Sequence, residues 1–124
     1  MTTLHYTEDH EWIRVEADGT ATVGITDHAQ DALGDIVFIE MPEVDRHFAK
    51  GDPACVVESV KAAADVKMPM AGTVVAVNDA LPDDPAKVNT DPMNAGWFLR
   101  IRPDDAADLE ALMDDAAYAK LLNV

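Results

Sequence analysis

Apolar and polar residues alternate with a period of two over much of this chain, in short segments that turn residues close. In the segment 11–16, Ile13 and Val15 alternate with charged neighbours, and Asp18-Gly19 then provides a hairpin turn before the partner segment 20–25. A period of two places alternate side chains on opposite faces of a sheet, so the pattern predicts half-buried antiparallel strands. Further strands are expected at 35–41, 54–58, 64–68, 73–77 and 97–102.

Three segments depart from simple alternation. Segment 35–41 is apolar on both faces, which predicts a buried strand, and Pro42 ends it. A brief helix is expected over 27–33, with Asp27 as its N-cap and Gly34 at its C-terminal end. Segment 79–96 contains several prolines and no clear period, which predicts an ordered loop.

The C-terminal segment, about 104–124, changes to a helical period. Apolar residues recur there at i, i+3 and i+4 in two places: Leu109, Leu112 and Met113, then Tyr118, Leu121 and Leu122. Aspartates that can cap the two helices precede them: Asp104 or Asp105, and Asp114 or Asp115. The chain 1–124 is therefore predicted to be a single, mostly β domain of two packed sheets or a flattened barrel, with a short internal helix and C-terminal helices.

The charge balance limits the partners. The 124 residues contain 24 acidic and 9 basic side chains, a formal net charge of −15, which disfavours nucleic acid and anionic membrane surfaces and suits basic protein partners. No apolar run approaches the ~20 residues needed to cross a bilayer. The N-terminal residues 1–5 have no signal-peptide or transit-peptide character, so a cytoplasmic protein of a prokaryotic cell is expected.

Motifs of catalysis are scarce. There is no glycine-rich phosphate loop and no H-E-x-x-H, and Ser59, the only serine, is not in a G-x-S-x-G context. Cys55 lies in the apolar run 54–57, where a buried hydrophobe is the favoured interpretation, although the sequence leaves a cysteine–histidine dyad open. The four histidines match no recurrent metal-ligand spacing, so neither an enzyme nor a metal site is expected.

Lys61 stands out within the segment 57–66. It is the only cation between Gly51 and Val66, small residues follow it at 62–64, and β-like runs flank it on both sides. A hairpin would place this lysine at its tip on a rigid support, as a carrier of a post-translationally attached acyl group requires. Lys67 lies within a predicted strand and is not expected to be modified.

From Tyr6 to Leu122 the sequence resembles the glycine cleavage system H-protein family, the lipoyl carriers of that system. The blocks that carry the resemblance occur in order: His10-Glu11-Trp12, Val23–Gln30 with Leu33–Val37, Glu58–Ala62, Val88-Asn89 with Asp91-Pro92, and Gly96-Trp97. The chain departs from the family pattern at Asp45-Arg46, Lys87 and Met93-Asn94. These departures bear on loop conformation and partner affinity, and they leave the lysine unaffected.

The resemblance implies a flattened β fold of the lipoyl and biotinyl carrier kind, in which lipoic acid forms an amide with Lys61. It implies a monomeric, non-catalytic carrier of glycine catabolism and one-carbon metabolism, with the chemistry carried by the cofactor. The implied partners are glycine decarboxylase, aminomethyltransferase, dihydrolipoyl dehydrogenase and a lipoyl ligase or transferase.

The resemblance also implies that the loaded arm can rest in a cleft of the body, with Glu11, His28 and Asp65 as candidate docking residues. Their ordinary structural interpretations are a strand-end carboxylate, a residue of a helix's first turn and a charge beside a turn. Two other functions remain open at this point: a lipoyl-relay or other acyl carrier that does not serve glycine decarboxylase, and an unmodified interaction module with a solvent-exposed lysine.

Overall fold

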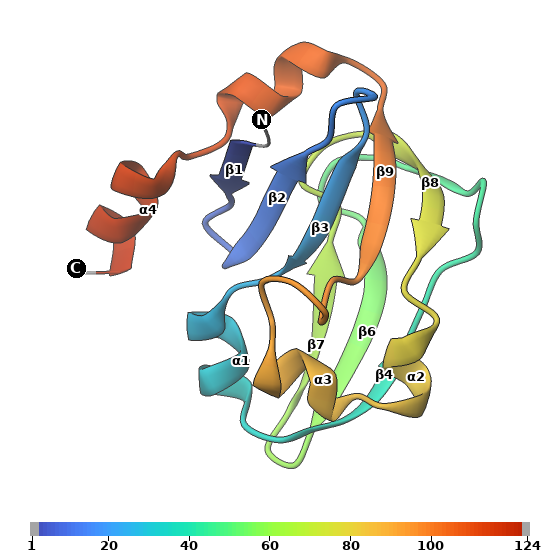
Figure 1. Cartoon of the computed structure of the whole chain (residues 1–124), viewed down its shortest axis with the longest axis vertical. Helices are drawn as coiled ribbons and strands as arrows, with labels where there is room; N and C mark the ends of the chain where they lie inside the picture. The colour runs from blue at the N-terminus through green and yellow to red at the C-terminus, as the bar shows by residue number, and fades with distance from the viewer. Residues whose placement is uncertain (1–2, 123–124) are drawn as a thin grey trace.

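A computed structural model describes residues 3–122 and shows two antiparallel sheets (Figure 1). The larger sheet has six strands in the order β1 (Thr3–Tyr6), β2 (Glu11–Val15), β3 (Ala21–Ile25), β9 (Leu99–Pro103), β8 (Gly72–Val77) and β5 (His47–Phe48). The smaller sheet has three, in the order β4 (Ile36–Glu40), β6 (Pro53–Ser59) and β7 (Ala63–Lys67). The mostly β fold predicted from the alternating pattern is confirmed. The short strands β1 and β5 were not predicted.

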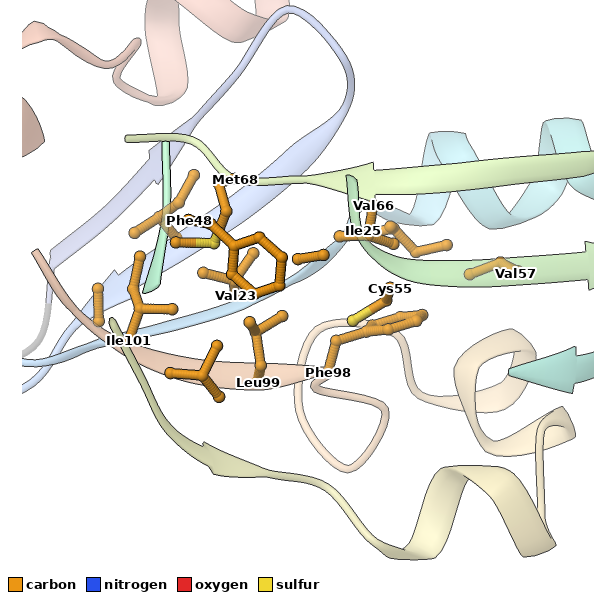
Figure 2. Packing of buried hydrophobic residues seen from close by; sticks show 14 of the residues in the cluster. Val23, Ile25, Phe48, Cys55, Val57, Val66, Met68, Phe98, Leu99 and Ile101 are labelled. Atoms are coloured by element: carbon orange, nitrogen blue, oxygen red, sulfur yellow. The ribbon is translucent and has the colours of Figure 1, made fainter. Parts of the chain in front are cut away.

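One core lies between the sheets and joins both of them. Val23, Leu99 and Ile101 of the larger sheet belong to the same buried cluster as Val57 and Val66 of the smaller one (Figure 2). All five side chains are 2% exposed or less.

The half-buried pattern expected for segment 20–25 is wrong, because all five residues of β3 are buried. Its second face is covered where the Trp12 ring lies over Gly24 and where Glu16 and Arg100 bond Thr22.

The internal helix α1 (Asp27–Leu33) has the predicted bounds, but a different residue caps it. Thr26 is the N-cap, and its hydroxyl oxygen accepts a hydrogen bond from the backbone N–H of Ala29. Asp27 instead lies in the first turn, where its carboxylate accepts from Gln30 Nε2. Gly34 ends the helix as predicted, with a positive φ of 81°.

The prediction that segment 35–41 is buried on both faces is wrong. Strand β4 lies at the edge of the three-stranded sheet, where β6 is its one partner strand among residues 3–122, and part of its apolar surface is exposed. Val37 and Phe38 are 57% and 47% exposed, whereas Ile36 and Ile39 are buried. The apolar outer face of β4 is thus part of the molecular surface.

Segment 79–96 contains two short helices instead of the predicted loop. They are α2 (Ala80–Asp83) and α3 (Ala86–Thr90), and each buries one apolar side chain, Leu81 and Val88 respectively. One buried residue per helix gives no period to detect. The strand expected at 97–102 begins at Leu99. Phe98 therefore precedes the strand, and its side chain is fully buried.

The C-terminal segment is helical in two pieces, of which the first is shorter than predicted. The 3₁₀ helix η1 (Ala106–Ala111) is capped by Asp105, and Met113 already pairs with the backbone of Tyr6. Helix α4 (Asp115–Leu122) begins after Asp114, which accepts from the N–H of Ala117. Residues 123–124 of the predicted segment, like residues 1–2, lie outside the described residues. Within 3–122, no helix is long and apolar enough to cross a membrane.

Candidate functional site

Lys61 lies at the tip of the β6–β7 hairpin, as the sequence predicted. The backbone N–H of Ser59 donates to the carbonyl oxygen of Ala62 at 2.8 Å, which closes the turn, and Lys61 is exposed. The hydroxyl oxygen of Ser59 also accepts from the N–H groups of Lys61 and Ala62, at 3.2 and 3.1 Å. The lone serine of the chain thus orders the turn that presents the lysine.

The Lys61 side chain lies against the turn between α1 and β4. A Cβ atom added at Gly34 would lie 3.1 Å from Lys61 Cε and 3.7 Å from Nζ. The N–H of Val60 donates to the carbonyl oxygen of Asp35 at 3.0 Å, which ties the hairpin tip to the same turn. Gly34 therefore has two structural roles. It adopts the positive φ that ends α1, and its lack of a side chain leaves room for the Lys61 stem.

The side chain of Asn89, in α3, stabilises the turn between α1 and β4 by hydrogen bonds. Its side-chain N–H₂ donates to the carbonyl oxygen of Gly34 and to Gln30 Oε1, both at 2.9 Å. Its Oδ1 accepts from the backbone N–H of Ile36 at 2.9 Å. Figure 1 shows α1, α3 and the hairpin loop gathered at one end of the molecule. Asn89 belongs to one block of the family resemblance, but no local pattern in the sequence indicates this structural role.

A cavity of about 200 Å³ opens beside β7, between β2, β3 and α1. Glu11 and Asp65 both line it, so the structure brings two of the three candidate docking residues together. Leu33 lines it too, and Leu33 immediately precedes the glycine on which the Lys61 stem lies. The Lys61 stem therefore lies against the residue that follows this part of the cavity wall, although Lys61 itself does not line the cavity.

Glu11 is 3% exposed, and both of its carboxyl oxygens have partners. Oε2 accepts from the backbone N–H of Lys67 at 2.7 Å, and Oε1 accepts from the hydroxyl of Thr7 at 3.2 Å. Burial raises the pKa of Glu11 to about 7, because desolvation outweighs the two hydrogen bonds that favour the charged form. This carboxyl can therefore hold or release a proton near neutral pH.

The other two candidates are placed differently. Asp65 pairs with Val56 and is exposed at the edge strand β7, at the rim of the cavity. His28 is exposed and does not line the cavity, but its ring lies 4.5 Å from the ring of His10, which does. Burial and the neighbouring His28 lower the pKa of His10. His28 thus contacts a lining residue of the cavity without lining it, and His10 stands in the sequence only within the first block of the resemblance.

Helix α4 contacts residues beside the same cavity through Tyr118. The Tyr118 hydroxyl lies 2.8 Å from His10 Nδ1 and 2.8 Å from the hydroxyl of Thr26, and its ring stacks on Tyr6. A C-terminal side chain therefore braces both the cap of α1 and a residue of the cavity. The sequence predicted Tyr118 as one of three apolar residues repeating along a helix, and no local signal indicates the bonds of its hydroxyl. Of the three, Tyr118 is buried, whereas Leu121 and Leu122 are exposed.

Cys55 is buried, as expected from its apolar run. Burial raises the pKa of its thiol to about 12, so the thiolate needed of a nucleophile is absent at neutral pH. This outcome argues against the cysteine–histidine dyad that the sequence left open.

Comparisons with a family model, with related sequences and with a solved structure all indicate the same family. The family model for the glycine cleavage H-protein matches residues 4–124. Glycine cleavage system H protein 1 of Pseudomonas aeruginosa is 56% identical over 99% of this chain and 96% of its own length. The H protein of Chromobacterium violaceum is 59% identical over 94% of this chain and 91% of its own. The crystal structure of an H protein from Mycobacterium marinum superposes with a TM-score of 0.89 at 38% identity, covering 98% of both chains.

Proposed function

The chain belongs to the glycine cleavage H-protein family, and we propose that Lys61 is the residue that carries its lipoyl group. Proteins of this family are lipoylated carriers and not catalysts, so the chemistry lies in the cofactor and in the partner enzymes. The partners are glycine decarboxylase, aminomethyltransferase, dihydrolipoyl dehydrogenase and the enzymes that attach lipoate. Family membership distinguishes this function from an unrelated acyl carrier or an unmodified module.

Bound through Lys61, lipoate would supply a redox-active dithiolane able to carry an aminomethyl group between the decarboxylase and the aminomethyltransferase. The chain itself supplies an amine at a defined position, a body that the enzymes recognise, and the effective concentration that comes with a tether. The residues present fit such a group, because Lys61 is exposed on an ordered turn and its stem lies over a residue without a side chain.

The observation that carries the assignment is the contrast between Lys61 and Lys67. Lys61 is presented by a turn that Ser59 closes. Lys67 lies six residues further along at the end of β7, and its backbone N–H is bonded to Glu11. Lys61 thus projects from the end of the hairpin, where an attachment enzyme can reach it, whereas Lys67 is held within the sheet by its backbone.

Replacing each lysine tests the assignment. We expect Lys61→Arg to fold normally and to remain unmodified by a lipoate attachment enzyme, since a guanidinium does not form the amide. Lys67→Arg is the matched control and should be modified like the parent protein. Intact mass, with fragmentation to locate the added group, is the measurement. Modification of the Lys61→Arg protein at another residue would refute the assignment.

The cavity beside β7 is proposed as the place where the body covers the loaded end of the arm. Three features support this: the Lys61 stem lies against Gly34, next to the lining residue Leu33; the walls include apolar Leu33 and Val57; and Glu11 supplies a buried carboxyl. Apolar walls exclude water, and a carboxyl that can accept a proton near neutral pH suits a cationic amine. Asp65 adds a second carboxylate at the rim, while His28 contributes through His10.

Decay of the isolated loaded protein tests this role. Glu11→Gln and Asp65→Asn should each accelerate release of formaldehyde and ammonia severalfold, because each removes a negative charge from the cavity. Asp83→Asn, an exposed aspartate of α2, is the control and should decay at the parent rate. Lipoylation and dehydrogenase reoxidation should be unchanged in all three. Equal decay rates in correctly folded variants would show that these carboxylates do not protect the group.

We also propose that the chain functions as a single-domain monomer in the cytoplasm of a bacterial cell. Its relatives are bacterial, and both sheets share one core. Sedimentation of the lipoylated protein at micromolar concentration tests the monomeric state, and a dimer would contradict it.

A further inference from the structure

We propose that three exposed apolar side chains beside the hairpin tip form the surface on which the lipoate attachment enzyme docks on the unmodified protein. These residues are Val37, Phe38 and Val60, and they are called the β4 patch below. This inference rests on the proposed role of Lys61 as the attachment site. It concerns how the enzyme recognises the body around that lysine.

The β4 patch is exposed and lies where β4 runs beside the end of β6 and the hairpin turn. Val37, Phe38 and Val60 are 57%, 47% and 66% exposed. Phe38 pairs directly with Glu58 of β6, and Val60 donates its N–H to Asp35, two residues before Val37. Single exposed apolar residues are ordinary, whereas a group of large ones on an ordered surface marks an interaction site.

The rim of the β4 patch is acidic. Asp35, Glu40 and Glu58 are all exposed around it, and strands β4 and β6 contain no basic side chain. Lys61 directly follows Val60 in the chain, and it is the reacting group itself. A complementary partner must therefore present an apolar contact with basic residues at its edge.

The attachment enzyme is the partner that must cover this surface, because it acts at the lysine's own amine. Lys61 Nζ lies by Gly34, at the turn that leads into β4. The enzyme joins Nζ to the carboxyl carbon of lipoyl adenylate: the C–N bond forms, the C–O bond to AMP breaks, AMP leaves and the amine loses a proton. Enzymes that act on the dithiolane work at the far end of a longer arm, so their chemistry does not require contact with the start of β4.

Steady-state lipoylation of the unmodified protein tests the proposal, with lipoate–protein ligase, ATP and lipoate, and intact mass as the readout. Phe38→Ser should raise the KM for the acceptor protein about tenfold, which corresponds to ~1.4 kcal/mol, and leave kcat within about twofold. Val37→Ser should have a smaller effect in the same direction. Val44→Ser is the matched control, since Val44 is 48% exposed and lies outside the β4 patch, and its KM should not change.

A charge variant and a second enzyme complete the test. Glu40→Lys replaces an exposed rim residue with little effect on folding and should also raise KM, so the proposal does not depend on the serine variants. After exhaustive lipoylation, reoxidation of each variant by dihydrolipoyl dehydrogenase should match the parent.

Unchanged KM in Phe38→Ser and Glu40→Lys would overturn the proposal. An equal loss in dehydrogenase turnover would also overturn it, because the surface would then not be specific to attachment. Neither outcome affects the assignment of Lys61, which fails only if the Lys61→Arg protein is modified.

Discussion

The hairpin tip and the Glu11 end of the cavity lie at the two ends of β7 and are built by opposite means. At the tip, Lys61 is exposed and its position is set by hydrogen bonds within a short turn. At the other end, Glu11 is 3% exposed, and its carboxyl bonds the backbone of Lys67, 56 residues away. The tip exposes the Lys61 amine to solvent, whereas the other end buries the Glu11 carboxyl away from it.

This contrast shows what each kind of site demands of the fold. Presenting an amine needs local order and open space, which Ser59 and Gly34 provide. Shifting the pKa of a carboxyl to about 7 needs desolvation, which only packing between distant segments supplies. We therefore expect the two ends to respond separately to substitution.

The largest expected effect comes from adding one methyl group at the buried end. A Cβ at Gly24 would lie 2.6 Å from three ring atoms of Trp12, which is fully buried and donates its indole N–H to Pro92. Gly24→Ala should lower the free energy of unfolding by about 3 kcal/mol, measured by chemical denaturation. Lipoylation of Lys61 below the unfolding transition should be unchanged.

A double mutant checks the cause. The smaller Phe ring lacks the outer ring of the indole, including the contacted Cζ2, and leaves more room for the new methyl. Combining Gly24→Ala with Trp12→Phe should therefore cost less than the sum of the single changes. Strict additivity would show that the loss of stability has another origin.

The next effect concerns pH. The folded pKa of Glu11, about 7, lies above its ordinary value of 4.5, so the native state binds more protons than the unfolded state between these values. The contribution of Glu11 to stability is therefore fully present below pH 4.5 and is lost as pH rises to about 7, by roughly 3 kcal/mol. Glu11→Gln should remove this loss and be more stable than the parent at pH 8, as measured by Tm between pH 4 and 8.

The reference for this measurement is the difference between variant and parent at each pH, because other groups titrate equally in both. A constant difference across the range would show that Glu11 is already ionised at low pH and that its burial does not shift its pKa.

The smallest effect is expected at the tip. Asn89→Ala removes the side chain that binds Gly34, Gln30 and the N–H of Ile36, which should cost about 1–2 kcal/mol. Amide hydrogen exchange should accelerate at Ile36 and at Val60. Asn94→Ala, at an exposed loop position, is the control, and it should leave both amides protected. The pH dependence attributed to Glu11 should be retained, since the buried end is untouched.

The sequence predicted the tip well because the interactions there are local. Ser59 and Ala62 are three residues apart, and a turn between two alternating segments is enough to place Lys61. The resemblance supplied Glu11 and Asp65 as candidates, but neither the burial of Glu11 nor the role of His10 follows from nearby residues. Both depend on contacts between segments far apart in the chain.

The other errors have similar causes. An apolar run such as 36–39 does not show whether another layer covers its second face, and none covers Phe38. At α1, two adjacent residues could cap the helix, and the backbone conformation selected Thr26. The helices α2 and α3 each bury a single residue, which is too little for periodicity to reveal.

The position of β9 between β3 and β8 has a consequence for synthesis on the ribosome (Figure 1). Ala21 pairs with Ile101, so β3, whose five residues are all buried in the finished protein, lacks its second neighbour until residues 99–103 have emerged. At ~5–20 residues per second this interval lasts several seconds. During it the apolar face of β3 is open to chaperones and to other nascent chains, and the larger sheet closes only when nearly the whole polypeptide has been made.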